Sequence, residues 1–164
     1  MLAAMKALGE RYPEMRFLHA SGKRDYDNCC AQFEAMGLNQ LANCNLSEYI
    51  YEMPLQMTAA DLIVCRAGAM TLTEIAAMKK AAILIPSPYV AYNHQYYNAK
   101  ALSDADGAML VEEAQLSSGV LTTAIENLAQ DGAKRKLMQE KIVAFATKDA
   151  NREIWEQILE MTKR

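Results

Sequence analysis

Apolar residues recur along the chain with helical and strand-like periods in alternation. Residues 2–8 carry apolar side chains at helical spacing and predict a helix that stops before Pro13. Residues 15–20 predict a short buried strand. Tyr26, Cys29, Cys30 and Phe33 then repeat at i, i+3, i+4 and i+7, which predicts a second helix.

Later apolar runs have no polar face and are typical of parallel strands covered on both sides. We expect a second strand to end near residues 49–51, and further strands at 62–65, 82–85 and 108–111. Helices are expected between them, at residues 55–60, at 71–78 and through 98–102. After Gln115 the pattern is wholly helical, with helices predicted near 120–129, 133–145 and 152–163.

Strands that alternate with helices predict an α/β fold: a Rossmann-like parallel sheet with helices on both faces. The length fits one domain, residues 1–164, whose C-terminal helices occupy about 119–164. Ligands of such sheets bind at the carboxyl ends of the strands. The turns to inspect therefore follow Ala20, Tyr51, Cys65, Pro86 and Val111.

Composition narrows the classes of function. The net charge is -3, with no basic stripe of the kind that binds nucleic acid. The chain is 52% apolar, but no apolar run approaches the roughly 20 residues of a transmembrane helix. The four cysteines match no zinc pattern and include no Cys-x-x-Cys pair, which favours buried thiols in a reducing compartment.

The turn after the 62–65 run is the best candidate for a phosphate site. Gly68 permits a sharp bend, and the helix that follows offers unpaired amides and a positive dipole end. A glycine that serves only close packing is the alternative. Thr71 and Glu74 have the spacing of a capping box, in which Thr71 is the N-cap of the helix and Glu74 reaches back to it. The spacing alone favours this interpretation. In the other interpretation, the Glu74 carboxylate accepts hydrogen bonds from two ribose hydroxyls.

The next loop, residues 86–98, begins with two prolines and ends in His94, Gln95 and Asn98. Amide side chains both donate and accept hydrogen bonds, which suits sugar hydroxyls, and His94 is expected to make a polar contact. A surface loop with capping residues is the alternative. The sequence contains no nucleophile–base pair, metal-ligand cluster, GxGxxG or Walker A motif, so we expect no catalytic residue, metal or cofactor here.

Together these segments resemble the MurG family of glycosyltransferases. Residues 60–76 (ADLIVCRAGAMTLTEIA) are similar to the family's donor-site signature, A-D-x-x-x-x-R-[SA]-G-A-x-T-x-x-E-[IL]. Residues 93–98 and the 19–23 turn, H-x-[ST]-G-K, also resemble family motifs. The resemblance runs from the first helix to the last.

The resemblance implies the donor-binding, C-terminal half of a GT-B enzyme that moves N-acetylglucosamine from UDP-N-acetylglucosamine to lipid I, forming lipid II. Ile50 and its neighbours would bind uracil through backbone groups, and Glu74 the ribose. The resemblance also implies that the nucleotide and diphosphate are contacted by Ala69, Met70 and Thr71. It implies that the sugar is contacted by His94, Gln95 and Asn98. Arg66 matches the motif either as a ligand contact or as a structural ion pair.

The chain also departs from the family pattern. A strand and a Gly-Gly-Ser phosphate loop that precede the first helix in the family are absent, as is the N-terminal domain with its acceptor site and membrane-facing patch. We therefore expect a fragment that lacks a central strand and is inactive alone. The full enzyme would be cytoplasmic and peripheral on the inner membrane face. The alternatives are another GT-B enzyme of the glycolipid type, or a non-catalytic nucleotide-sugar-binding subunit of a split transferase.

Overall fold

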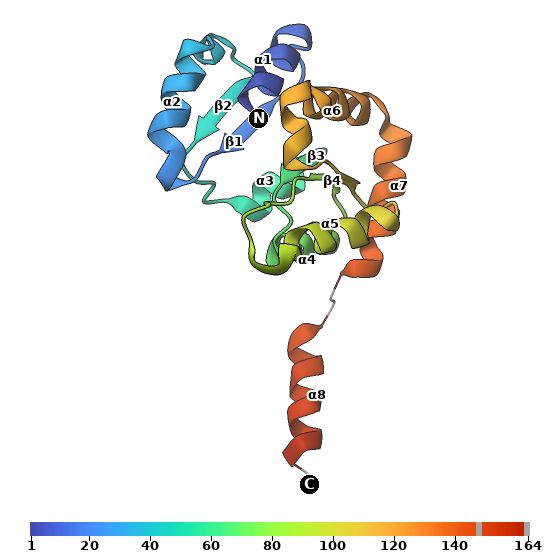
Figure 1. The fold of residues 1–164 in the computed structure, drawn as a ribbon. Coiled ribbons are helices and arrows are strands. Elements are labelled where there is room, and N and C mark those ends of the chain that lie inside the picture. Colours follow the sequence, from blue (N-terminus) through green and yellow to red (C-terminus); the bar gives the residue numbers. More distant parts are fainter. Residues whose placement is uncertain (147–148, 163–164) are drawn as a thin grey trace.

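The computed structural model describes residues 1–146 and 149–162 and contains two parallel sheets flanked by helices (Figure 1). In the first sheet, β1 (Phe17–Ala20) pairs with β2 (Cys44–Ser47). In the second, the order is β3 (Leu62–Cys65), β4 (Ala81–Leu84), β5 (Met109–Leu110). All three pairings are parallel, which confirms the predicted α/β class.

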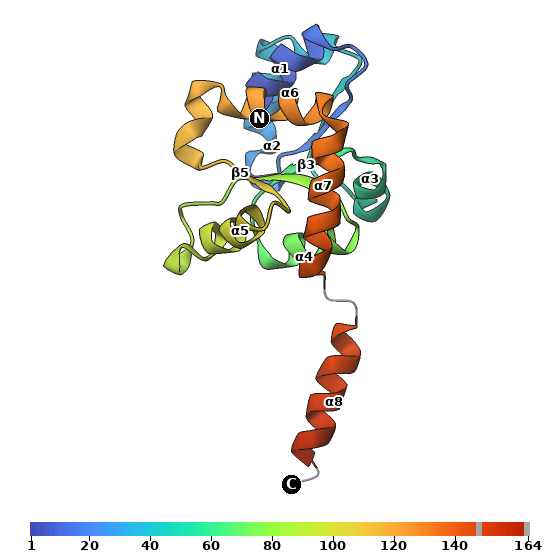
Figure 2. The same cartoon turned by 90° about the vertical axis from the view of Figure 1, so that its right-hand side faces the viewer.

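Eight α-helices are present in the described residues. They are α1 (Leu2–Arg11), α2 (Tyr26–Ala35), α3 (Met53–Ala59), α4 (Ala69–Ala77), α5 (His94–Asp104), α6 (Val120–Gln130), α7 (Gly132–Ile142) and α8 (Ala150–Thr162). A 3-10 segment, η4 (Glu113–Ser118), links β5 to α6. Figure 2 shows α1 and α6 on one side of the β3–β5 sheet, and α4 and α5 on the other.

The centre of the core is β4, whose residues are all buried. Its side chains alternate between the faces of the sheet, as the strand period requires. Ala81 and Ile83 pack with residues of α1 and α6. Ala82 and Leu84 pack on the opposite face with residues of α4 and α5. This packing confirms the prediction that the apolar run at 82–85 forms a parallel strand covered on both sides.

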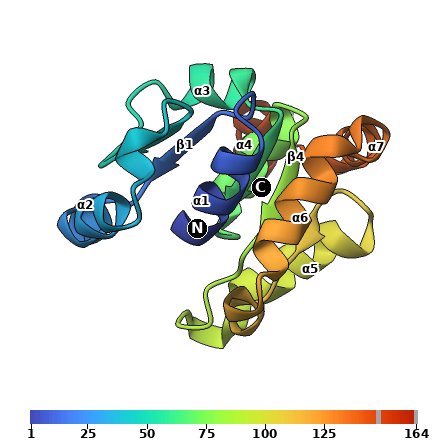
Figure 3. The same cartoon turned by 90° about the horizontal axis from the view of Figure 1, so that it is seen from above.

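The two sheets do not join, because β1 pairs only with β2 and β3 only with β4 in the described part of the chain. Viewed from above, α1 lies between β1 and the β3–β5 sheet (Figure 3). Phe17 of β1 and Leu62 and Val64 of β3 are only partly buried, yet all three pack against the core cluster that contains α1 residues Ala4 and Leu8. The sheet is thus interrupted beneath α1.

Several element boundaries differ from the sequence prediction. The second strand ends at Ser47, not near residues 49–51, and Tyr49 and Tyr51 are exposed and in edge-to-face contact with each other. The helix expected at 71–78 begins at Ala69. The last strand has only two residues. Residue 163, the predicted end of the last helix, lies outside the described residues.

The C-terminal helix α8 projects away from the rest of the molecule (Figure 1). Its apolar side chains, among them Ile154, Trp155 and Ile158, are exposed, and none of its residues is buried. Among the described helices, none has both the length and the apolar content to cross a bilayer.

Candidate functional site

The bend between β3 and α4 places free backbone amides at the carboxyl edge of the sheet. Gly68 is the N-cap of α4, and its carbonyl accepts the first intrahelical bond from the Leu72 N–H (3.0 Å). The amides of Ala69, Met70 and Thr71 precede that bond, so the helix does not use them. Ala67 is fully buried and anchors the bend, whereas Ala69 and Met70 are exposed. This geometry suits an anionic ligand.

The capping-box interpretation of Thr71 and Glu74 is wrong. The N-cap is Gly68, no side chain caps the helix, and Thr71 is already the third helical residue. Glu74 is exposed and lies one turn beyond Met70, which is 80% exposed, on the same face of α4. The carboxylate is therefore available to a ligand beside the bend.

The amide side chains of Gln95 and Asn98, which were predicted to contact a sugar, form hydrogen bonds that hold the loop after β4 in place. The N–H of Ser87 donates to Gln95 Oε1 (2.9 Å), and Asn98 Nδ2 donates to the Ala67 carbonyl (3.2 Å). His94 is exposed, and its Nδ1 lies 2.9 Å from the Ala91 carbonyl oxygen. Both amide groups thus hold the loop in place, and Asn98 ties it directly to the bend.

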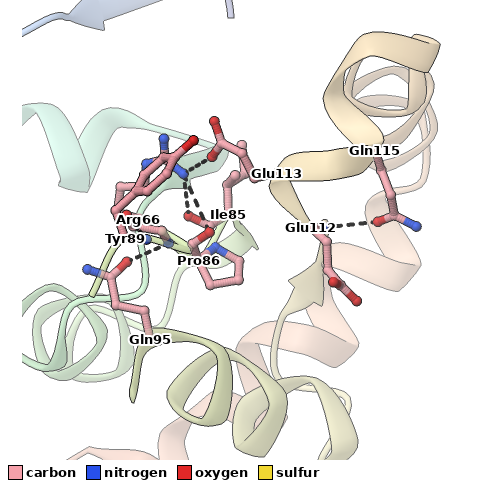
Figure 4. Close-up of polar contacts among 9 residues, drawn as sticks. Arg66, Ile85, Pro86, Tyr89, Gln95, Glu112, Glu113 and Gln115 are labelled. Atoms are coloured by element: carbon pink, nitrogen blue, oxygen red, sulfur yellow. Dashed lines mark hydrogen bonds and ion pairs between the residues drawn. The ribbon is translucent and has the colours of Figure 1, made fainter. Parts of the chain in front are cut away.

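Arg66 lies at the junction of three strand ends (Figure 4). Its Nη1 donates to the carbonyls of Ile85 (3.3 Å) and Pro86 (3.5 Å) and forms an ion pair with the carboxylate of Glu113. Sequence reasoning did not single out Glu113, because no local signal marks a pair whose members are 47 residues apart.

A cavity of about 350 Å³ lies between this loop and the start of η4. Its lining includes Pro86, Tyr89, Asn93 and Glu113. Asn93 has a left-handed backbone (φ 51°), which is uncommon outside glycine and gives the loop a sharp turn beside the cavity. In the described residues, no group of three or more His, Cys, Asp or Glu side chains is placed to hold a metal ion.

Most of the predicted site residues lie in the turns and helices that follow the strands of the β3–β5 sheet. The bend, Arg66 and the 94–98 segment are joined by the contacts described above. Ile50 follows β2 and so belongs to the other sheet, across the interruption, where it is partly buried. Its position after a carboxyl strand end agrees with the general rule for such folds.

His19 lies near the end of β1, and its surroundings affect how stability depends on pH. Burial, with a smaller effect of the Met1 ammonium group, lowers the pKa of His19 below its usual 6.5. As pH falls through about 6.5, the unfolded chain takes up a proton that the folded chain resists, so stability should fall. His19→Gln should reduce this loss between pH 7 and 5, measured by urea denaturation. An equal effect of His94→Gln would contradict the assignment to His19.

Comparison with known proteins gives a consistent result. Residues 1–154 match the model of the glycosyltransferase family 28 C-terminal domain. A relative from Acetivibrio thermocellus is 36% identical over 146 residues, which are 89% of this chain and 39% of the relative. A relative from Burkholderia multivorans is 36% identical over 151 residues, or 92% of this chain and 40% of its own length. Both are named UDP-N-acetylglucosamine--N-acetylmuramyl-(pentapeptide) pyrophosphoryl-undecaprenol N-acetylglucosamine transferase.

The crystal structure of Acinetobacter baumannii MurG is similar in fold, with a TM-score of 0.75 and 25% sequence identity. The match covers 96% of this chain and 48% of that protein. The chain therefore spans about two fifths of the length of the curated relatives and about half of the solved structure.

Proposed function

Because the chain belongs to the glycosyltransferase family 28 C-terminal domain family, we propose that it binds the donor of a glycosyl transfer, UDP-N-acetylglucosamine, at the carboxyl edge of its sheets. The observation that carries the proposal is the start of α4 at the Gly68 bend, where Ala69 and Met70 are exposed and Glu74, one turn further along the helix from Met70, is exposed as well. The amides of Ala69, Met70 and Thr71 face the diphosphate, and Glu74 accepts hydrogen bonds from the ribose hydroxyls.

The sugar lies against the loop after β4. Gln95 and Asn98 each use one atom of the side-chain amide within the protein, Oε1 in the first and Nδ2 in the second. The other atom of each amide is directed to the sugar hydroxyls, and exposed His94 adds a polar contact. Ile50 and the backbone around it contact the uracil ring from the other sheet.

The relatives' names supply the wider reaction. In a protein of the relatives' length, the acceptor is N-acetylmuramyl-(pentapeptide) pyrophosphoryl-undecaprenol, whose hydroxyl attacks the anomeric carbon of the donor. The bond to UDP breaks, and negative charge develops on the departing diphosphate. The amides and dipole of α4 stabilise that charge, and the base that accepts the proton lies outside this chain. The reaction takes place at the cytoplasmic face of the membrane, where a lipid-linked acceptor is presented.

The interrupted sheet supports the proposal that this chain acts as one domain of a larger transferase. A further parallel strand between β1 and β3 would pair with both open edges and end beside the start of α1. Burial lowers the pKa of the Met1 amino group, and the charges of Cys29 and then of Glu113, which lies just after β5, oppose that shift by smaller amounts. A loop from such a strand into α1 would thus reach the same edge as the bend.

Nuclear magnetic resonance titration tests the donor site. Adding UDP-N-acetylglucosamine to the ¹⁵N-labelled chain should shift the amide signals of residues 66–74 and 87–98, with weak affinity because the site is open on one side. Strand-end residues on the opposite edge, such as Asn43 and Asn45, serve as internal controls. Shifts confined to that opposite edge, or none at tens of millimolar ligand, would refute the proposal.

A further inference from the structure

We infer that Arg66 is a positioning residue that fixes the sugar-binding loop after β4 relative to the diphosphate-binding bend, through its ion pair with Glu113. This inference rests on the proposed donor site and assigns Arg66 a role other than contact with the ligand. One donor molecule has its diphosphate at the bend and its sugar at the loop, so the distance between the two decides whether both bind together.

The backbone alone does not set that distance. The β3–β4 ladder ends where the Ile85 N–H donates to the Cys65 carbonyl (2.8 Å). Beyond this bond the two segments of the backbone separate. The segment after β3 enters the bend at Gly68, and the segment after β4 enters the loop that begins at Pro86. Arg66 is the first residue past the ladder on β3, and its side chain reaches the carbonyls of Ile85 and Pro86.

Glu113 determines the direction of the guanidinium. Figure 4 shows the Glu113 carboxylate turned toward Arg66, while the neighbouring Glu112 points away. A guanidinium that already contacts a carboxylate and two carbonyls has its charge balanced within the protein. This arrangement gives Nη1 of Arg66 a positioning role within the protein. The guanidinium has further N–H donors on Nη2 and Nε, so the binding test below separates positioning from a direct contact with the diphosphate.

The contacts of Arg66 also form one wall of the 350 Å³ cavity, because Pro86 and Glu113 both line it. Asn98 makes a second link, between the bend and α5, through the Ala67 carbonyl. Two side chains therefore connect the segment after β3 to the segment after β4. Of the two side chains, Arg66 and Asn98, only Arg66 has a charged partner from a third element, which is Glu113 of η4.

The test compares the binding of UDP, which has no sugar to place against the loop, with that of UDP-N-acetylglucosamine, which reaches both bend and loop. Dissociation constants are measured by the same titration for the wild-type chain, Arg66→Lys, Glu113→Gln and the double variant. The ratio of UDP-N-acetylglucosamine affinity to UDP affinity should fall at least about fivefold in Arg66→Lys and in the same direction in Glu113→Gln. The double variant should be no worse than Arg66→Lys, because both act through one pair.

The possible outcomes separate the alternatives. Equal loss of both affinities would mean that Arg66 contacts the nucleotide directly, and an unchanged ratio with a lower melting temperature would mean a purely structural pair; either overturns the positioning role. If Arg66→Lys does not fold, the Glu113→Gln ratio decides alone. If the wild-type chain binds neither ligand, the donor site itself is refuted, and the inference with it.

Discussion

Glu74→Gln is expected to weaken the binding of UDP-N-acetylglucosamine by at least tenfold with little change in melting temperature. Hydrogen bonds to a charged group contribute about 1.5–3 kcal/mol, which corresponds to roughly 10- to 150-fold in affinity. Glutamine keeps the shape of the side chain but loses the charge and one acceptor oxygen. Stability should be retained, because Glu74 is exposed and does not cap α4.

Glu34→Gln is the matched control, because Glu34 is also an exposed helical glutamate, on α2, away from the proposed site. Affinity can be followed by the shifts of residues 66–74, and stability by thermal unfolding. A clear drop in melting temperature with unchanged donor affinity would assign Glu74 a structural role and remove the ribose contact.

Leu84→Ala is expected to have the largest effect on folding. Leu84 is fully buried in β4, in the same core cluster as Ala67, the residue that anchors the bend. Removing a buried leucine side chain costs about 2–5 kcal/mol, out of a total stability of about 5–15 kcal/mol for a typical domain. The packing around Ala67 should loosen together with the rest of this core cluster, so the bend should become less well ordered.

Urea denaturation followed by circular dichroism measures this loss. Trp155 is a poor probe, since it lies 58% exposed on the projecting helix α8. Leu137→Ala, at a position 47% exposed on α7, is the control and should cost much less. Similar losses in both variants would show that β4 is not the centre of the core.

The sequence predicted the elements better than their ends. The fully apolar runs at 62–65 and 82–85 identified β3 and β4 to within a residue, because parallel strands covered on both faces carry mostly apolar side chains. The end of β2 was placed too late, since Tyr49 and Tyr51 have the composition of a strand but face solvent.

The site shows the same limit. Gly68 was identified as the bend, but the start of α4 was placed at Thr71 because Thr-x-x-Glu is a frequent helix start. The helix instead begins at Ala69, and its N-cap, Gly68, has an ordinary extended backbone (φ -70°, ψ 139°). The partners of Arg66 and Asn98 could not be predicted, because both contacts join segments that are distant in the sequence and depend on how the strand ends separate.

The interruption between β1 and β3 also bears on how the chain behaves at high concentration. Each of these strands has one side without a partner strand in the described residues, so its backbone N–H and C=O groups can pair with another molecule. Half-buried Leu62 and Val64 would be shielded from water by such pairing. We therefore expect crowded samples of this chain to assemble edge to edge, and an extended peptide that pairs with the same strand edges to compete with that assembly and keep the molecules apart.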